Sequence, residues 1–333
     1  MKVIVPMAGM GKRLRPHTLT IPKPLIPVAG KSIVERLVED IAAITGEQLE
    51  EVAYVTGRFG SDAERDLIAV AERLGAKGRI CYQDEALGTA HAILCAADSL
   101  HGHVTVAFAD TLFRADFKPD PSADGVLWVQ RIENPEQFGV VKLDAEGNIT
   151  DFVEKPKTFV SDLAMIGIYS FKDGAALKAE LNYLIDNHIM NGGEYQLPDA
   201  LRNMMKKGMK FVVGEVTDWM DCGNKDATVD TNRKVLNYIQ QDLSIPASAS
   251  VVESTIIQPC YIGENVKLHQ SVVGPHVSIG SGSKISGSII RNSIIQSDCE
   301  LNNMQVYDSM LGRAVKAQNQ RGSYSLGDYS EIK

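Results

Sequence analysis

The last third of this chain carries isolated aliphatic residues at a spacing of six, and this period restricts the possible folds more than any other feature. Two registers can be read, at Ile256, Ile262 and Leu268 and at Val273, Ile279 and Ile285, with Ile295 and Leu301 continuing after a slip. Such a period is typical of a parallel β-helix, in which each flat face turns one aliphatic side chain inward and stacking buries a continuous core. A length of about 80 residues predicts four or five coils of about 18 residues each. An ordinary antiparallel β domain remains the alternative.

The first 240 residues follow a different pattern, in which short β-branched runs alternate with helical periodicity. The pattern predicts buried strands at residues 3–5, 52–55, 80–82 and 104–108, followed by short strands at 126–129, 140–143, 149–153 and 166–171. It predicts helices at residues 32–44, 174–188, 197–207 and 226–239. Repetition of strand, helix and strand implies parallel pairing with right-handed crossovers, so we expect a Rossmann-like mixed sheet.

A stretch rich in Ser, Ala and Pro separates these two patterns and predicts a linker at residues 241–250 between domains 1–240 and 251–333. The 34 Lys and Arg against 42 Asp and Glu give a net charge of −8, which argues against a protein whose task is to bind nucleic acid. No apolar run resembles a signal peptide or a membrane span, so we expect a cytoplasmic protein without a membrane partner. The widely spaced cysteines predict buried free thiols; they are Cys81, Cys95, Cys222, Cys260 and Cys299.

A glycine-bearing loop rich in cations, residues 6–16, directly follows the first predicted strand. Glycines allow close backbone approach, so amide N–H groups can point at phosphate oxygens while Lys and Arg supply charge. The candidate nucleotide-binding residues of this loop are Ala8, Gly9, Gly11 and Lys12, and Arg13 is a candidate catalytic cation. A dinucleotide fingerprint would need glycine in place of Leu14, and a P-loop would need Ser or Thr in place of Arg13. The pattern therefore favours a triphosphate cradle, and a plain turn with solvated charges is the alternative.

Two further positions offer chemistry. Lys23 lies between two prolines, which stiffen the backbone and would hold its ammonium as a point charge near a phosphate. Asp110 lies two residues beyond the predicted strand at residues 104–108, and open α/β sheets bind ligands beyond the carboxyl ends of their strands. A carboxylate in that place is a candidate ligand for a hard metal ion. A solvated loop lysine and a capping aspartate are the plainer readings.

The combination resembles the sugar-1-phosphate nucleotidylyltransferase family, the NDP-sugar pyrophosphorylases that include glucose-1-phosphate thymidylyl- and uridylyltransferases. The match covers roughly residues 1–240, and its signature lies in residues 9–16 and 22–25. The resemblance implies that Arg13 holds the β- and γ-phosphates and that Lys23 serves the reacting phosphates. The expected fold class is α/β, with a Rossmann-like mixed-sheet nucleotidyltransferase domain followed by a short left-handed parallel β-helix built from hexapeptide repeats.

The resemblance also implies contacts to the nucleoside and to a metal ion. Gln83 would contact the pyrimidine base, since an amide can pair with the donor and acceptor edge of uracil or thymine. Gly88 and Thr89 would pack beneath the nucleoside. Asp110 and Asp221 would hold Mg²⁺ between the α-phosphate and the sugar phosphate. This sequence has Ala109 and Asn224 where the family commonly has Gly and Thr.

The middle of the chain resembles the sugar-binding half of the family. The residues implied for the sugar are Gly139, Glu154, Gly167 and Glu194, with Lys155 at the sugar phosphate. The expected reaction joins a sugar 1-phosphate, with glucose 1-phosphate the commonest acceptor, to UTP or dTTP and releases pyrophosphate. No covalent intermediate is needed, because the attacking oxygen is already an anion and the task is positioning and electrostatics.

Two other functions remain open at this stage. Hexapeptide β-helices also build acyltransferases that use a histidine base, for which His269 and His276 are the candidates. A sugar-nucleotide sensor without catalysis is the other, although Lys23, Asp110 and Asp221 argue against it. We also expect a homo-oligomer, because β-helix coils tend to pack their flat faces and cover their open ends.

Overall fold

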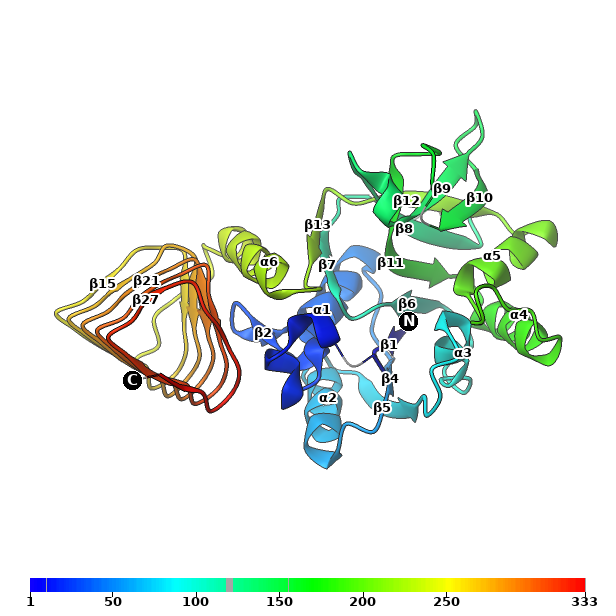
Figure 1. Ribbon diagram of the computed structural model, residues 1–333. Coiled ribbons are helices and arrows are strands. Elements are labelled where there is room, and N and C mark those ends of the chain that lie inside the picture. Colours follow the sequence, from blue (N-terminus) through cyan, green and yellow to red (C-terminus); the bar gives the residue numbers. More distant parts are fainter. Residues whose placement is uncertain (10, 118–121, 155, 333) are drawn as a thin grey trace. The chain divides into compact units, whose positions relative to one another are not determined.

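The computed structural model describes residues 1–9, 11–117, 122–154 and 156–332, and Figure 1 labels many of its elements. The chain forms two compact units, each made of two segments. Unit 1 contains Met1–Gly9 and Leu37–Trp219, and unit 2 contains Met10–Arg36 and Met220–Lys333. The predicted division into domains 1–240 and 251–333 stays a prediction.

Unit 1 is built on a mixed sheet, which has nine strands in the described residues. Its parallel strands are β1 (Lys2–Pro6), β4 (Glu51–Thr56), β5 (Lys77–Tyr82) and β6 (Val104–Ala107). The antiparallel part contains β8 (Gly125–Arg131), β9 (Gly139–Leu143), β10 (Ile149–Glu154) and β11 (Leu163–Phe171), with β12 (Phe211–Glu215) parallel to β8. The order β10-β9-β11-β6-β1-β4-β5 confirms the Rossmann-like mixed sheet, because β1 lies centrally with its parallel neighbours β6 and β4 on either side.

Helices bury their apolar stripes against this sheet. They are α1 (Ile33–Thr45, in unit 1 from Leu37), α2 (Ser61–Arg73), α3 (Thr89–Leu94), α4 (Gly174–Asp186) and α5 (Leu197–Lys206). Leu177, Leu181 and Leu184 of α4 recur at helical spacing and join the core that contains Ile4 and Val106 of the sheet. The predicted elements are confirmed to within a few residues. The sequence did not yield α2, β12 or the short strands β7 (Thr111–Arg114) and β13 (Asp218–Asp221).

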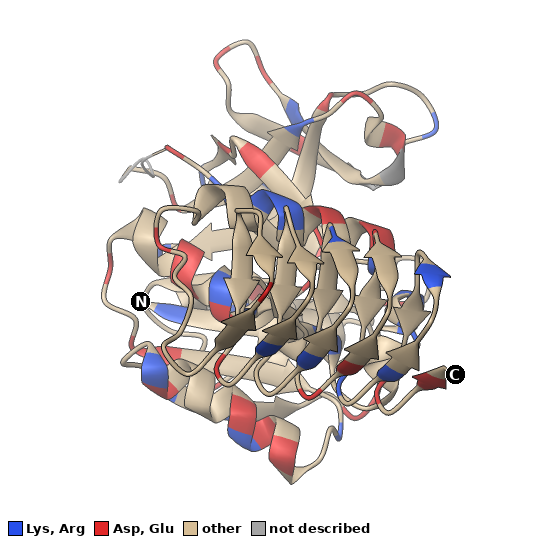
Figure 2. Ribbon diagram, turned by 90° about the vertical axis from the view of Figure 1, so that its left-hand side faces the viewer, with Lys and Arg blue, Asp and Glu red and all other residues tan. Residues whose placement is uncertain are grey.

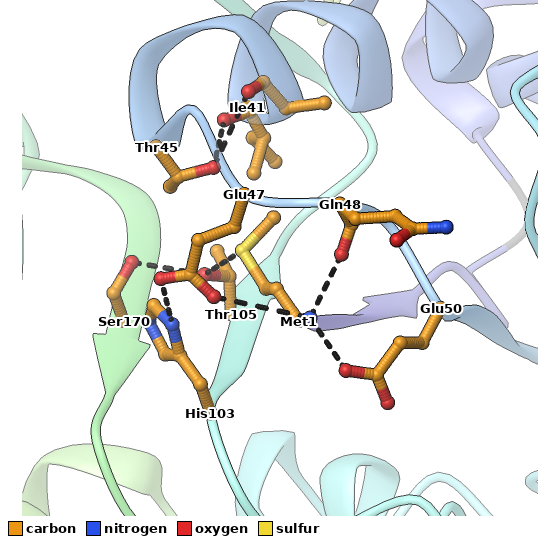
Figure 3. Close-up of polar contacts among 10 residues, drawn as sticks. Met1, Ile41, Thr45, Glu47, Gln48, Glu50, His103, Thr105 and Ser170 are labelled. Carbon is orange, nitrogen blue, oxygen red and sulfur yellow. Dashed lines mark hydrogen bonds and ion pairs between the residues drawn. The ribbon is translucent and has the colours of Figure 1, made fainter.

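Polar contacts join the first strand to its neighbours (Figure 3). The amino group of Met1 donates to Gln48 O and to Glu50 Oε1, both at 2.9 Å. Thr105 of β6 and Ser170 of β11 lie with their hydroxyl oxygens 3.0 Å apart, both buried. These contacts tie the chain start to the segment before β4 and tie β6 to β11, near the amino end of β1.

Unit 2 contains the predicted β-helix. In the described part of the unit its coils form three parallel sheets, of six, five and five strands. The six-stranded sheet runs from β14 (Ser250–Val252) through β17 (Lys267–His269), β20 (Lys284–Ser286), β23 (Glu300–Asn302) and β26 (Lys316–Gln318) to β29 (Glu331–Ile332). From β17 on, each strand of this sheet begins with a charged residue, and Lys284 and Glu300 pair at 3.0 Å. Figure 2 shows Lys, Arg, Asp and Glu along the successive coils. Strand pairing confirms a parallel β-helix and excludes the antiparallel alternative.

The coils are shorter than the expected 18 residues. Lys267 pairs with Lys284, 17 positions later, whereas Lys284 pairs with Glu300 after 16 and Lys316 with Glu331 after 15. The slip in the six-residue period is therefore the loss of a residue at a corner, which leaves the inward positions aligned. Seven of the eight predicted inward aliphatics are buried, and Ile256 of the first coil is partly buried against the same core.

Unit 2 also contains residues 11–36 and helix α6 (Lys225–Tyr238). The early segment forms three single 3-10 turns, η1 (Lys12–Leu14), η2 (His17–Leu19) and η3 (Lys23–Leu25), and a short hairpin of β2 (Pro27–Val28) and β3 (Lys31–Ser32). This segment therefore has little regular structure of its own, and its conformation depends on what it packs against.

All five cysteines lie in the described ranges and are free thiols. Cys222, Cys260 and Cys299 are buried as predicted, whereas Cys81 and Cys95 are only partly buried. Burial raises the pKa of Cys260 to about 11 and that of Cys299 to about 12, so both stay protonated near neutral pH. Across the described residues, no helix combines the length and the apolar character needed to cross a bilayer.

Candidate active site

The predicted site residues are divided between the two units. Unit 1 contains Ala8, Gly9, Gln83, Gly88, Thr89, Asp110, Gly139, Glu154, Gly167 and Glu194. Unit 2 contains Gly11, Lys12, Arg13, Lys23 and Asp221. Lys155 lies outside the described residues. The structure therefore brings together two subsets, one within each unit.

In unit 2, the glycine-rich loop folds back on the lysine between the prolines. Gly11 has φ +56°, and its carbonyl accepts hydrogen bonds from Thr18 Oγ1 at 2.9 Å and Leu14 N at 3.0 Å. A Cβ atom on Gly11 would lie 3.1 Å from Lys23 Cβ, so only glycine allows this approach without a shift. Gly11 and Lys23, predicted separately, are neighbours.

A second close contact in unit 2 involves Arg13 and Asp221. A Cβ atom on Gly223 would lie 2.9 Å from Asp221 Oδ1, 3.0 Å from Asp221 Oδ2 and 3.2 Å from Arg13 Nη2. The carboxylate and the guanidinium therefore lie against one glycine, although the two residues are far apart in the sequence. Both side chains are exposed, and so are available to a ligand.

The start of α6 fixes the turn that carries Asp221. Asp221 Oδ1 accepts a hydrogen bond from Gly223 N at 2.8 Å, and the Asp221 carbonyl accepts one from Thr231 Oγ1 at 2.7 Å. Asn224, which replaces the family's usual threonine, caps the helix by accepting from Ala227 N at 3.0 Å. Thr228 Oγ1 donates to Asn224 O at 2.7 Å. The substitution therefore keeps the capped helix that orients the aspartate.

In unit 1, Gln83 lies at the carboxyl end of β5 and folds over its own turn. Its backbone N–H donates to Thr56 O at 2.9 Å, which extends the ladder between β4 and β5. Its amide Nε2 donates to Gly88 O at 3.3 Å and lies 3.2 Å from His91 Nδ1. His91 therefore helps to orient the Gln83 amide.

The predicted nucleoside and sugar segments are joined directly. Gly88 has φ +112°, and a Cβ atom on it would lie 2.4 Å from Tyr195 O, inside the backbone of the segment that holds Glu194. Ala90 N donates to Tyr195 O at 2.9 Å, and Tyr195 N donates to Leu87 O at 2.8 Å. Thr89 Oγ1 accepts from Leu197 N at 2.9 Å, so this hydroxyl caps the start of α5. This structural role of Thr89 was not predicted.

The remaining predicted sugar residues lie on the strands beside β6. Gly167 has φ +82° at a register shift in β11, and its carbonyl accepts from Phe108 N at 3.0 Å, two residues before Asp110. Gly139 and Glu154 are directly paired on β9 and β10. The glycine in β11 therefore lies next to the strand end that carries the predicted metal ligand.

An aromatic contact that sequence reasoning missed lies beside this strand end. Trp219 Nε1 donates to Thr111 Oγ1 at 3.5 Å, and the Trp219 ring meets the Phe138 ring edge-on at 4.9 Å between centroids. Thr111 follows Asp110, and Trp219 precedes Asp221 by two residues. The only signal in the sequence was the tryptophan two residues before the aspartate, because the side-chain partners come from distant segments.

His17 is the one histidine of the segment before Lys23, and burial lowers its pKa to about 4. Desolvation is the main cause; nearby Asp328 opposes it, and Lys225 adds to it. His17 is therefore neutral at physiological pH. Of the acyltransferase candidates, His269 is exposed on β17 and His276 Nε2 lies 2.9 Å from Asn237 Oδ1 of α6, and their role stays a hypothesis.

The two aspartates offer donor chemistry that fits Mg²⁺. This ion prefers carboxylate and phosphate oxygens and is usually held by one or two carboxylates together with substrate phosphates. The Gly223 N–H that binds Asp221 Oδ1 orients the carboxylate as the partners of metal ligands do. In the ranges that the structure describes, no three His, Cys, Asp or Glu side chains cluster as a ready metal site. That Asp110 and Asp221 hold one ion stays a prediction.

A Rossmann-like sheet followed by a glycine- and cation-bearing loop defines an α/β enzyme that handles nucleotides. The sequence profile of the family described as Nucleotidyl transferase matches residues 2–238, and the chain belongs to this family. The protein is therefore a nucleotidyltransferase, and the predicted family resemblance is confirmed.

Two curated relatives are similar over nearly the whole chain. The low-salt glycan biosynthesis nucleotidyltransferase Agl11 of Haloferax volcanii is 28% identical, covering 95% of this chain and 93% of its own. The glucose-1-phosphate thymidylyltransferase of Streptomyces antibioticus is 26% identical, covering 100% and 99%. Among solved structures, the nucleoside-diphosphate-sugar pyrophosphorylase of Vibrio cholerae RC9 superposes with a TM-score of 0.60 at 21% identity, covering 69% of this chain and 99% of its own. The last of these supports the fold.

Proposed function

We propose that this nucleotidyltransferase joins UTP or dTTP to a sugar 1-phosphate, with glucose 1-phosphate as the acceptor, and releases pyrophosphate. A phosphate oxygen of the sugar attacks the α-phosphorus of the triphosphate and expels pyrophosphate in line. The observation that carries the proposal is a pair of close contacts in unit 2. Gly11 lies against Lys23, and the Arg13 guanidinium and the Asp221 carboxylate both lie against Gly223. The relative named glucose-1-phosphate thymidylyltransferase, similar over the full chain, supports the choice of substrates.

The cations have distinct tasks in this proposal. Arg13 binds the β- and γ-phosphates, where a planar guanidinium can take two oxygens and can follow the departing pyrophosphate. Lys23 is held by the neighbouring prolines and by its contact with Gly11, and its ammonium is a point charge beside the reacting phosphates. Lys155 binds the sugar phosphate. Because both reactants are anions, these charges reduce their repulsion and hold them in line.

The two aspartates supply the metal ligands. We propose that Asp110 and Asp221 hold Mg²⁺, which when bound neutralises charge on the reacting phosphates. The contact between Trp219 and Thr111 supports this assignment, because it joins the segments that follow Asp110 and precede Asp221.

The neutral parts of the substrates meet unit 1. We propose that Gln83 binds the pyrimidine edge through Oε1, since its Nε2 is engaged by Gly88 O and His91. Gly88 and Thr89 form the floor beneath the nucleoside. Gly139, Glu154, Gly167 and Glu194 surround the sugar. The rigid joint between residues 88–90 and Tyr195 supports a single binding surface for base and sugar.

The test is pyrophosphate release by the full chain with Mg²⁺, measured for UTP, dTTP, CTP, ATP and GTP against several sugar 1-phosphates. We expect release with a pyrimidine triphosphate and glucose 1-phosphate, and a shift in base preference in the Gln83→Ala variant. Absence of pyrophosphate release with every pair would refute the function. Release with purine triphosphates alone would refute the role of Gln83.

A further inference from the structure

Residues 16–30, the segment that carries Lys23, contact the β-helix near both of their ends. Both attachments lie within unit 2. At the first, His17 Nε2 lies 3.1 Å from Ser325 Oγ, and Thr20 Oγ1 donates to Asp328 Oδ2 at 2.8 Å. A Cβ atom on Gly327 would lie 3.0 Å from Pro16 Cβ, so the chains touch there as well. These β-helix residues belong to the last coil, in β28 (Ser325–Leu326) and the turn after it.

The second attachment joins the β2–β3 turn to the early coils. Asn232 of α6 is fully buried, and its Oδ1 accepts from Ala29 N at 2.9 Å and from Ser278 Oγ of the β-helix at 2.7 Å. Next to it, a Cβ atom on Gly30 would lie 2.2 Å from Cε2 of the Tyr261 ring. One buried amide oxygen therefore bridges the segment and the coil, and glycine is required where the aromatic ring packs.

One of the predicted site cations lies between these attachments. Lys23 lies between the two attachments, and Gly11 is tied to the same segment through the hydrogen bond from Thr18 Oγ1 to Gly11 O. The segment has only single 3-10 turns and a two-residue hairpin, so its own hydrogen bonds cannot hold it rigidly. A loop that binds charged phosphates catalyses best when it is ordered before the substrate arrives.

We propose that the last coil of the β-helix is a positioning element of the nucleotidyl transfer site, with Ser325 and Asp328 as positioning residues that hold the phosphate-binding segment through His17 and Thr20. The inference rests on the proposed function, because it takes Arg13 and Lys23 as the residues that bind the phosphates. It gives the β-helix a task within one chain that does not depend on assembly or on acyl transfer. The buried Asp328 side chain, 1% exposed, is placed for this task, since its Oδ1 is held by Arg313 N at 2.8 Å while Oδ2 takes Thr20.

The experiment compares two serines of the same coil in the full chain. Ser325→Ala removes the contact to His17, whereas Ser323→Ala removes a hydrogen bond to Asp308 O that lies within the β-helix. A second pair uses the other partner: Thr20→Val removes the donor to Asp328, and Thr20→Ser keeps it. Hydrogen exchange of peptides covering residues 11–25 measures the order of the segment without any substrate. Pyrophosphate release gives KM for the triphosphate, KM for the sugar 1-phosphate and kcat.

We expect faster exchange in residues 11–25 for Ser325→Ala and Thr20→Val, together with a roughly 3- to 10-fold higher KM for the triphosphate, which corresponds to the loss of one hydrogen bond. The KM for the sugar 1-phosphate and the melting temperature should change little, and Ser323→Ala and Thr20→Ser should behave as wild type. Unchanged exchange in both Ser325→Ala and Thr20→Val would overturn the inference, as would equal effects of Ser325→Ala and Ser323→Ala. A wild-type enzyme without pyrophosphate release would instead refute the proposed function, while the exchange comparison would still decide whether the coil orders the segment.

Discussion

Replacing Gly223 by alanine should separate catalysis from stability. The new Cβ atom would lie 2.9 Å and 3.0 Å from the carboxylate oxygens of Asp221 and 3.2 Å from Arg13 Nη2, whereas ordinary Cβ contacts begin at 3.4 Å. The carboxylate must therefore retreat by about half an ångström, and the guanidinium by less. Both are the ends of exposed side chains that can move, and Gly223 is not among the glycines with positive φ. We therefore expect the free energy of unfolding to change by less than about 0.5 kcal/mol.

The same displacement should be costly in the reaction. A misplacement of about 1 Å lowers a rate roughly 100-fold, so half that shift in two charged groups is expected to lower kcat/KM roughly 10- to 100-fold. This corresponds to about 1.4 to 2.7 kcal/mol of transition-state stabilisation. The assay is steady-state pyrophosphate release with Mg²⁺, measured beside thermal unfolding of the same preparations.

Gly102→Ala is the matched control, because its effects should be reversed. A Cβ atom on Gly102 would meet nothing within 4 Å, but its φ of +65° disfavours alanine, so this variant should lose about 1 kcal/mol of stability and keep its kcat/KM. If Gly223→Ala retained the wild-type kcat/KM, the assignment of Arg13 and Asp221 to the reaction would be wrong. A Gly223→Ala variant that lost activity only in proportion to lost folding would also contradict the argument.

Three further predictions concern other parts of the molecule. Asp110→Asn should lower pyrophosphate release roughly 100- to 1,000-fold while circular dichroism stays native, and near wild-type release at saturating Mg²⁺ would contradict a metal role. Because the folded-state pKa of His17 is lowered from 6.5 to about 4, its neutral form stabilises the fold fully above pH 6.5, and that stability is lost as the pH falls toward 4. Urea unfolding should therefore show about 2 kcal/mol less stability at pH 5 than at pH 7.5, and His17→Gln should lack that component; an equal pH dependence in both proteins would show that His17 is not its source. Gly88→Ala places a Cβ atom 2.4 Å from Tyr195 O at a φ of +112°, so melting curves should show a loss of more than about 2 kcal/mol, and an unchanged melting temperature would contradict the close packing of these segments.

Much of the fold could be predicted because its signals are local. The strand and helix ranges in the first part follow hydrophobic periodicity, and most lie within a few residues of the observed elements. The errors occur where the pattern was weak. Helix α2 is a strongly charged helix with a narrow buried stripe, and β7 and β13 are four-residue strands outside the main sheet. The coil length of the β-helix was overestimated because corner residues can be lost without disturbing the inward positions.

The candidate site residues were predicted one by one, whereas the contacts among them were not predicted. Motif resemblance pointed to Gly11, Lys23, Arg13 and Asp221 as separate marks along the chain. No periodic signal marks the contact of Gly11 with Lys23 or the contact of Arg13 and Asp221 with Gly223. Each contact joins segments that only the folded chain brings together. The residues that support them, such as Thr18 and Thr231, looked like ordinary polar positions.

By itself the sequence determined the two kinds of architecture. The six-residue period of the β-helix and the hydrophobic periodicity of the strands and helices identify the side chains that face inward. It also marked the family, because a glycine-rich loop and a lysine between prolines are contiguous features. Only the tertiary structure decided that residues 16–30 are held by the last coil of the β-helix, through partners as distant as Thr20 and Asp328, and by its early coils, through Tyr261 and through Asn232 of α6. The physical reason is that a segment with little regular structure takes its conformation from its surroundings, and those surroundings exist only once the chain has folded.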